Sequence, residues 1–184
     1  MQLGFYFDQS RCTGCYTCQV ACKDWNDIPA GPVSWRTMVP IEQGKFPNVS
    51  LAYHFHGCQH CARPDCLAAC PVNAIVKRPA DGIVLIDAAL CIGKERCGLC
   101  LEACPWDVPQ FAEGPDAKAQ MCTFCADRWA DGRKPACVDS CIMRALDAGP
   151  LGELIAKYGD ARSATGFSYV AKTDPSIVFK PRED

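Results

Sequence analysis

The sequence lacks a long apolar run, because no stretch approaches the roughly 18 residues that would suggest a membrane-spanning helix. Its first residues, MQLGFYFDQSRC, also lack the basic and apolar segments of a secretory signal. We therefore expect a soluble chain that is cytoplasmic, or that is exported already folded with a partner carrying the signal. Any link to a membrane would come through another protein.

The sequence has no excess of basic charge and no motif for chemistry on a substrate. It has 19 Lys and Arg residues and 21 Asp and Glu residues, for a formal net charge of −2. The sequence therefore gives no sign of the basic surface that binds nucleic acid. We find no nucleophile–base pattern and no phosphate-binding loop. The chain by itself is therefore not expected to be an enzyme.

Cysteine, by contrast, is abundant, and all 16 cysteines fall into four quartets with none left over. The first quartet has the spacing C-x2-C-x2-C-x3-C of bacterial ferredoxins. Since a cubane cluster needs four thiolates, the sequence predicts four [4Fe–4S] clusters. The quartets are Cys12, Cys15, Cys18 and Cys22; Cys58, Cys61, Cys66 and Cys70; Cys91, Cys97, Cys100 and Cys104; and Cys122, Cys125, Cys137 and Cys141.

Other uses of these cysteines fit the pattern less well. Disulfides are rare in reducing compartments, and neighbouring C-x2-C pairs would be strained partners for each other. The fourth quartet alone would pass as a zinc site. However, Cys70-Pro71 and Cys104-Pro105 carry the C-P ending of the ferredoxin signature. A zinc-binding interaction module remains a remote alternative.

Histidine is scarce, and the three histidines crowd around the second quartet. A Rieske centre needs two histidine ligands, but none follows His60. We expect His54, His56 and His60 to be polar neighbours of the cysteines rather than metal ligands.

The spacing of the middle quartets predicts the plan of a two-cluster ferredoxin. Asp81-Gly82 separates the runs Val72–Val76 and Ile83–Asp87, which indicates a hairpin between two quartets. Strands are expected to lead into the first two quartets, and short helical turns to carry later cysteines. These expected elements are strands Leu3–Asp8 and Val49–Phe55, and turns Leu67–Cys70, Leu101–Cys104 and Val138–Ala145.

In two-cluster ferredoxins the fourth cysteine of one run binds the other cluster. Applied here, this rule predicts an α+β, loop-rich fold of two interlocked modules whose core is built around four clusters. The outer module would be residues 1–50 plus 118–149, with the inner module 51–117 inserted. The predicted ligand sets are Cys12, Cys15, Cys18 and Cys141; Cys22, Cys122, Cys125 and Cys137; Cys58, Cys61, Cys66 and Cys104; and Cys70, Cys91, Cys97 and Cys100.

Two segments lie outside this plan. Residues 23–48 are rich in Pro and Gly and are expected to form a long loop, where Trp25, Trp35 and Met38 would either meet a partner or pack over the clusters. Residues 150–184 form a C-terminal extension expected to pack on a partner, with a short helix at Leu151–Tyr158 and an extended tail at Pro175–Pro181.

Most of residues 11–146 resemble one family. The matching stretches are RCTGCYTCQVAC, HGCQHCARPDCLAACPVNAI, GIVLIDAALCIG, CLEACPWDVPQF and CTFCADRWADGRKPACVDSCIMRAL. They are similar to the four-cluster electron-transfer subunit of molybdenum and tungsten pterin oxidoreductases of the dimethyl sulfoxide reductase type, whose relatives serve formate dehydrogenases and other enzymes of anaerobic respiration. The resemblance implies a large pterin-dependent catalytic partner and often a membrane anchor that exchanges electrons with quinone. It places the ligands on the same sixteen cysteines.

The third quartet departs from the family pattern. The family usually has C-x2-C here, but this chain has Cys91-Ile-Gly-Lys-Glu-Arg-Cys97, and Lys94 stands where a cysteine is expected. Cys97 can bind the cluster only if the intervening loop bulges.

Several cations adjoin the cysteines in sequence: Arg11, Lys23, Lys94, Arg96, Arg128 and Arg144. A cation near a cluster would favour its reduced, more negative form, whereas a solvated side chain would have little effect. The function predicted from the sequence is a relay of single electrons between a pterin enzyme and a membrane subunit or soluble carrier. The alternative is a free-standing polyferredoxin that serves several enzymes.

Overall fold

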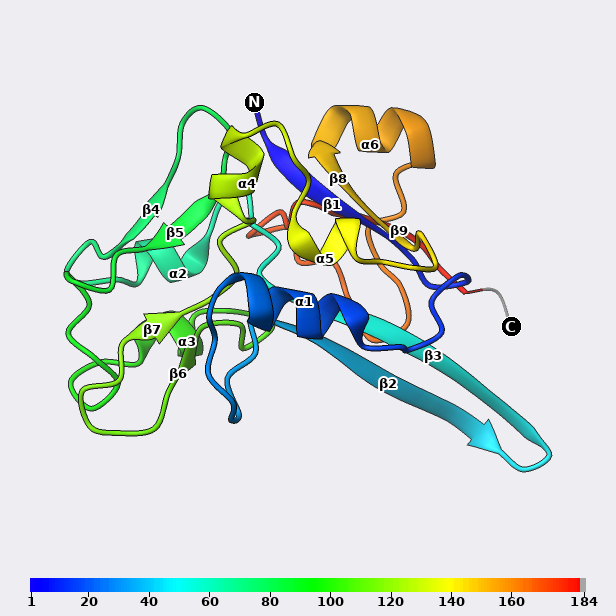
Figure 1. Ribbon diagram of the computed structural model, residues 1–184, viewed down its shortest axis with the longest axis horizontal. Helices are drawn as coiled ribbons and strands as arrows, with labels where there is room; N and C mark the ends of the chain where they lie inside the picture. Colours follow the sequence, from blue (N-terminus) through cyan, green and yellow to red (C-terminus); the bar gives the residue numbers. More distant parts are fainter. Residues whose placement is uncertain (183–184) are drawn as a thin grey trace.

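The N-terminal strand is the middle strand of a three-stranded sheet in the computed structural model, which describes residues 1–182. Strand β1, Leu3–Asp8, pairs antiparallel with β8, Leu146–Pro150, and parallel with β9, Ile177–Lys180 (Figure 1). All six residues of β1 are buried because both of its edges are paired and both of its faces are covered. The strand expected at these residues is confirmed.

The two faces of β1 are covered by different parts of the chain. On one face, helix α6, Leu151–Tyr158, packs so that the rings of Tyr6 and Tyr158 stack with centroids 3.7 Å apart. On the other face, Phe5 and Phe7 join the main core, as the two-residue repeat of a strand requires. The helix expected at residues 151–158 is confirmed.

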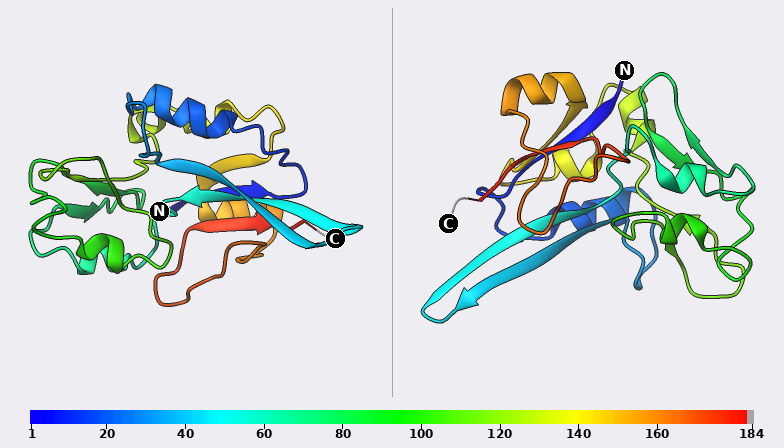
Figure 2. Two further views of the ribbon diagram at one scale, coloured as in Figure 1. Left: turned by 90° about the horizontal axis from the view of Figure 1, so that it is seen from below. Right: turned by 180° about the vertical axis from the view of Figure 1, so that it is seen from behind.

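A long hairpin projects from the body of the molecule (Figures 1 and 2). It pairs β2, Arg36–Lys45, with β3, Asn48–Gly57, in continuous antiparallel register. The base of the hairpin is buried, whereas Phe46 at its tip is 92% exposed. The strand expected around Val49–Phe55 is therefore confirmed and longer than expected.

The expectation of a loop over residues 23–48 is wrong in part. Helix α1, Thr17–Trp25, runs into this range, and β2 occupies its second half. The local sequence does not favour a strand here, and β2 forms because β3 pairs with it along its whole length. A two-stranded ribbon has two free outer edges, and a residue without an N–H, such as Pro40, is tolerated there.

The middle of the chain forms two small hairpins and two helical turns at the left of Figure 1. Strand β4, Ile75–Lys77, and strand β5, Val84–Ile86, pair antiparallel around Gly82, as expected. The elements are α2, Asp65–Ala68; β4, Ile75–Lys77; β5, Val84–Ile86; α3, Leu99–Glu102; β6, Gln110–Phe111; and β7, Ala119–Gln120.

Two further short helices precede β8: α4, Ala126–Ala130, and α5, Ala136–Asp139. The helix expected over Val138–Ala145 is wrong beyond α5. Arg144 adopts a left-handed conformation (φ 48°), and the Ala145 N–H donates to the sulfur of Cys141 at 3.3 Å. The chain thus wraps around a cysteine sulfur instead of continuing the helix.

The segment after residue 150 packs on this chain itself. Ile177, Val178 and Phe179 of β9 are buried beside β1 and contribute to the core. The extended tail expected at Pro175–Pro181 therefore lies largely within the sheet, and residues 183 and 184 of the expected extension lie outside the described residues. The mixture of short helices and strands confirms the α+β class. Within residues 1–182, no helix has both the length and the apolar character needed to cross a membrane.

Candidate metal centres

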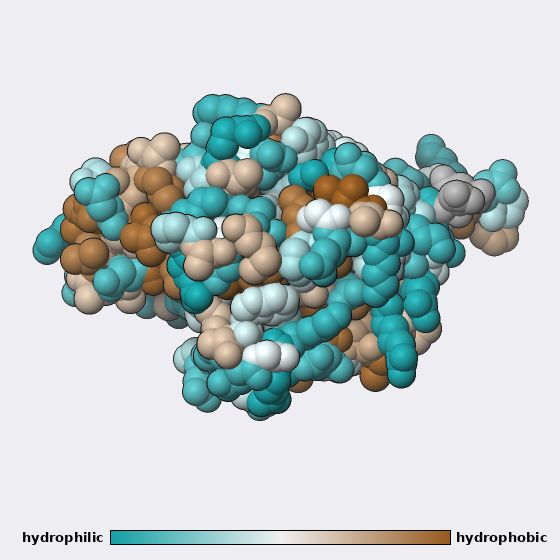
Figure 3. Space-filling model, turned by 90° about the horizontal axis from the view of Figure 1, so that it is seen from above, coloured by the Kyte–Doolittle hydropathy of each residue, from teal (hydrophilic) through white to brown (hydrophobic). Residues whose placement is uncertain are grey.

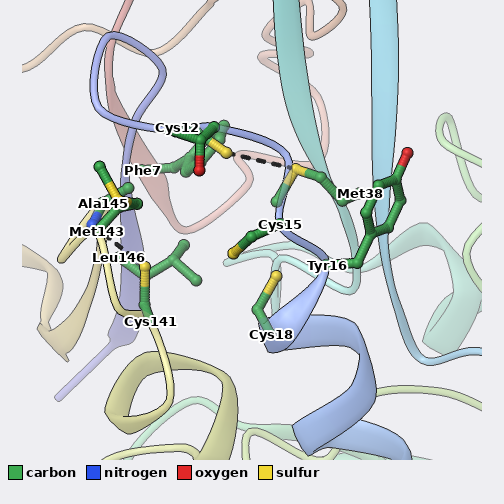
Figure 4. A pocket seen from close by; sticks show the side chains of 11 residues that line it. Phe7, Cys12, Cys15, Tyr16, Cys18, Met38, Cys141, Met143, Ala145 and Leu146 are labelled. Atoms are coloured by element: carbon green, nitrogen blue, oxygen red, sulfur yellow. Dashed lines mark hydrogen bonds between the residues drawn. The ribbon is translucent and has the colours of Figure 1, made fainter.

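The fold gathers the sixteen cysteines into four groups, each drawn from two quartets, and all sixteen are free thiols. The first site is a pocket lined by Cys12, Cys15, Cys18 and Cys141. Their side chains surround a common space closed by Phe7 and Met38 (Figure 4). The Cys12 sulfur lies 3.9 Å from the Met38 sulfur.

Two more groups line separate pockets. The third site is lined by Cys58, Cys61, Cys66 and Cys104. The fourth site is lined by Cys70, Cys91, Cys97 and Cys100. Apart from Gln59 at the third site, apolar residues form the remaining walls of both pockets.

The second site is the most buried group. Cys22, Cys122, Cys125 and Cys137 are each no more than 5% exposed. They lie near enough that the thiolate charges of Cys122 and Cys125 raise the pKa of Cys22, after the larger effect of burial. The four spatial groups have the same members as the ligand sets predicted from the crossed rule; ligation itself stays a prediction.

Short helices explain why each quartet divides between two sites. The third and fourth cysteines of every quartet are four residues apart, and the third lies on α1, α2, α3 or α5. This spacing advances about 6 Å along a helix and keeps the side chains on one face. Because α1 packs against α5 and α2 against α3, each helix pair holds cysteines of two neighbouring sites.

One backbone conformation recurs beside the first cysteine of every quartet. The residue two positions after it is left-handed in all four cases: Gly14 (φ 66°), His60 (φ 46°), Gly93 (φ 88°) and Phe124 (φ 58°). Two of these four are not glycine, and a left-handed conformation is costly for such residues unless the surroundings require it. The repeat indicates a loop shape that the cysteine sites demand.

Backbone N–H groups point at several of the sulfurs in a repeated pattern. The N–H groups of His60 and Phe124 donate to Cys58 and Cys122, two residues earlier, at 3.4 Å. The N–H groups of Ala74 and Ala145 donate to Cys70 and Cys141, four residues earlier, at 3.3 Å. Ala119 donates to Cys91 at 3.4 Å. Such donors stabilise thiolates, which are the form that binds metal.

The irregular third quartet still forms a complete group. Gly93 keeps the same left-handed turn as Gly14, and residues 94–96 are exposed on a bulge. The Cys97 N–H then donates to the Gly93 carbonyl at 3.0 Å, which returns Cys97 to the cavity that Cys91 lines. Lys94, at the position where a cysteine is expected, is exposed to solvent.

The electrostatics of the sites require a cationic partner for the thiolates. Burial raises the pKa of Cys18, Cys22 and Cys66 to about 12, with neighbouring thiolates adding to the effect. Bound metal offsets both costs because it binds the deprotonated form.

The spacing of the cysteines bears on which metal they suit. Within residues 1–182, no three His, Cys, Asp or Glu side chains lie close enough to share a single ion. A tetrahedral zinc ion would hold its sulfurs only about 3.8 Å apart. Four thiols that line one space but lie too far apart to share a single ion fit a larger iron–sulfur cluster instead.

The side chains of the histidines and of most sequence-adjacent cations do not contact the cysteine sulfurs. His60 is buried, with its Nδ1 accepting from the Val84 N–H, and burial lowers the pKa of His54 to about 4. Lys23 donates to two backbone carbonyls, and Arg128 pairs with Asp139. The other cations, Arg11, Lys94, Arg96 and Arg144, are exposed.

The aromatic and methionine residues singled out in the sequence have different roles. Met38 is buried against the first site, and Trp35 is half-buried with its Nε1 donating to Gln120. Trp25 is exposed, donates to Asp127 and lies against the guanidinium of Arg128 at 4.4 Å. Met38 and Trp35 thus pack within the fold, and Trp25 alone of the three has a large free surface.

One residue that the sequence did not reveal is Arg36, which is buried between cysteine sites. It lies 14 residues from the nearest cysteine in the chain, so proximity in sequence gave no signal. Only the register of β2 against β3, which places Arg36 opposite Gly57 and next to Cys58, brings it there.

Comparison with known proteins assigns the class that these sites define. A family model described as "4Fe-4S dicluster domain" matches residues 49–151, and one described as "4Fe-4S binding domain" matches residues 3–24. The protein is an iron–sulfur protein that binds [4Fe–4S] clusters, and its sixteen cysteines fit four of them.

Relatives that match along most of this chain identify its family more narrowly. The B subunit of anaerobic dimethyl sulfoxide reductase from Escherichia coli K12 is 42% identical over 98% of this chain and 89% of its own length. The corresponding subunit of Haemophilus influenzae is 39% identical over 99% of this chain and 90% of its own. The formate dehydrogenase-O iron-sulfur subunit of E. coli K12 is 35% identical over 77% of this chain and 51% of its own. The chain belongs to the family of iron–sulfur subunits of the dimethyl sulfoxide reductase type.

Proposed function

We propose that this chain relays single electrons through four [4Fe–4S] clusters held by the four cysteine sites. The observation that carries the proposal is the order of the sites. The first and second sites share the packed helices α1 and α5, and the third and fourth share α2 and α3. Cys122 of the second site lies near enough to Cys58 of the third that its thiolate charge raises the pKa of Cys58. These contacts support a row of sites in the order first to fourth, as a relay needs.

The sixteen cysteines are the ligands in this proposal. The first cluster is held by Cys12, Cys15, Cys18 and Cys141, and the second by Cys22, Cys122, Cys125 and Cys137. The third is held by Cys58, Cys61, Cys66 and Cys104, and the fourth by Cys70, Cys91, Cys97 and Cys100. When bound, each cluster supplies one-electron oxidation and reduction.

The chain's own residues insulate the second site and leave both ends of the row near the surface. All four thiols of the second site are buried, whereas Cys15 of the first is exposed. Tyr16, next to Cys15, and Ile142, next to Cys141, are 41% and 70% exposed. Near the fourth site, Leu90 and Leu99 adjoin its cysteines in sequence and are exposed. Figure 3 shows apolar surface at the end of the molecule formed by the β4–β5 and β6–β7 hairpins. Electrons would enter and leave at these two ends.

The names of the relatives support particular partners. Relatives are subunits of dimethyl sulfoxide reductase and formate dehydrogenase, so we propose a large molybdenum- or tungsten-pterin catalytic subunit at one end. A quinone-linked membrane subunit or a soluble carrier would serve the other end. This chain would be non-catalytic, and Trp25 and the hairpin tip are exposed elements available to a partner.

A reductive titration under anaerobic conditions tests the relay. We expect the purified chain to take up about four electrons, one per cluster, with bleaching of its visible absorbance. Uptake of about two electrons would contradict the proposal, and a colourless protein containing zinc would replace it with the interaction-module alternative.

The partner is tested separately by isolating the native complex. We expect a large pterin-containing subunit to co-purify and to be identified by mass spectrometry. A chain that elutes alone from size exclusion, with all its iron, would favour the free-standing polyferredoxin.

A further inference from the structure

Within residues 1–182, one arginine is fully buried without an acidic partner. Arg36 is 0% exposed, and within residues 1–182 no Asp or Glu lies within ion-pair distance of it. Its Nη2 donates to the Cys58 carbonyl at 2.6 Å, but Nε and Nη1 have no hydrogen-bond partner. Arginine does not lose its proton in proteins, and a buried charge without a counterion is costly. The structure therefore calls for an anion near this side chain.

The surroundings are shaped to hold the guanidinium. Its carbon lies 4.1 Å from the centroid of the Phe5 ring and 4.5 Å from that of Phe55, within range of cation–π attraction. Gly57 stands opposite Arg36 in the hairpin. A Cβ on Gly57 would lie only 2.8 Å from Arg36 Cδ and 2.9 Å from Nη1, so the glycine leaves the space that the arginine fills.

The guanidinium lies between the second and third cysteine sites. On one side it donates to the backbone carbonyl of Cys58, a residue of the third site. On the other side it lies against Phe5, whose ring packs 4.5 Å from that of Phe124. The N–H of Phe124 donates to the sulfur of Cys122 in the second site. Burial lowers the pKa of Arg36, but thiolates of these two sites outweigh burial, so the net direction is upward. The thiolates with the largest effect are Cys122, Cys137, Cys58 and Cys22, all from the second and third sites.

We propose that Arg36 is the shared countercharge of the second and third clusters and raises the reduction potential of both. This inference rests on the proposed function, because it assumes that the four sites hold clusters. Reduction adds a negative charge to a cluster, and a fixed cation in a dry, low-dielectric position stabilises the more negative form. Arg36 thus acts through the clusters as a positioning residue: it favours an electron on the two inner sites of the row.

The test compares Arg36→Met, which keeps much of the volume but removes the charge, with Arg36→Lys, which keeps the charge. Iron content is measured first, and the potentials follow from redox titration monitored by electron paramagnetic resonance. Cysteine-to-serine variants of each site assign the signals. We expect Arg36→Met to lower the equilibrium constant for reduction at least tenfold at the second and third clusters, about 59 mV for one electron. The first and fourth should not change, and Arg36→Lys should move both inner potentials back toward the unmodified value.

Arg162→Met is the matched control, because Arg162 is also largely buried but pairs with Asp160 and Asp174. This variant should shift none of the four potentials.

A full iron content with unchanged potentials in Arg36→Met would overturn the proposal. A fall in potential at only one inner cluster, or equal falls at all four clusters, would overturn it as well. If Arg36→Met loses iron and Arg36→Lys retains it, the need for a countercharge is supported. Iron loss in both variants would overturn the proposal by showing that shape is required rather than charge. The iron content of the unmodified chain, and whether it shows four reduction potentials, test the proposed four-cluster relay independently of Arg36.

Discussion

At the scale of single residues, the spacing of two cysteines on one helix decides how the sites interlock. Cys18 and Cys22 lie one turn apart on α1. Cys18 lines the first site, whereas Cys22 lies with Cys122, Cys125 and Cys137 in the second. Cys137 and Cys141, at the other end of the chain, divide in the same way. Residues far apart in sequence thus complete each other's sites.

This interlocking predicts which substitutions behave alike. Cys22→Ser should alter the same spectroscopic signal as Cys122→Ser, and Cys12→Ser the same signal as Cys141→Ser, because each pair shares a site. Electron paramagnetic resonance of the reduced variants, with iron content, gives the comparison. If Cys22→Ser instead matched Cys12→Ser, the crossed assignment would be wrong.

At the scale of secondary-structure elements, β9 closes the sheet that supports the first two sites. Ile177 is fully buried beside Phe5 of β1, and the same strand contributes Phe179 to the core. Removing residues 150–184 would therefore disrupt the fold, so a loss of assembly in such a variant would say nothing about a partner. Partner contacts are better sought at exposed elements such as the hairpin tip.

The importance of β9 is open to a direct measurement. We expect Ile177→Ala to lower the free energy of unfolding of the cluster-loaded protein by about 2–5 kcal/mol, the usual cost of a cavity in a core. Val49→Ala, at a strand position that is 48% exposed, should change it by less than about 0.5 kcal/mol. Denaturation midpoints under anaerobic conditions provide the values, and equal effects of the two substitutions would contradict this role of β9.

The sequence predicted some of these elements and missed others for physical reasons. Strand β1 and the β4–β5 hairpin have local signals, namely an aromatic run and an Asp-Gly turn. Strand β2 contains Pro40 and Gly44, and it exists because β3 pairs with it along its whole length. Arg36 could not be foreseen for the same reason, since its position depends on that pairing. The groups of cysteines were predictable because the quartets have ferredoxin spacing, to which the crossed rule of two-cluster ferredoxins applies.

At the scale of the whole molecule, the cysteine sites make up part of one continuous core. Seven of the cysteines are buried, and most of the others pack against the core from its edge. Around them the chain is held in left-handed turns that cost free energy without a compensating partner. Metal binding should therefore provide much of the free energy of folding.

Removal of the metal should reveal this dependence. We expect a chain stripped of iron by chelation under oxidising conditions to lose most of its cooperative thermal transition and its near-ultraviolet circular dichroism. Reconstitution with iron and sulfide should restore both. A stripped chain that kept a sharp transition at the original temperature would show that the apolar contacts suffice for folding.

The central claim, that the four sites hold four cubane clusters, is tested most directly by counting iron and acid-labile sulfide in anaerobically prepared protein. We predict about sixteen of each per chain, since every cubane contains four irons and four sulfides. A count near eight irons, with zinc making up the difference, would contradict the account.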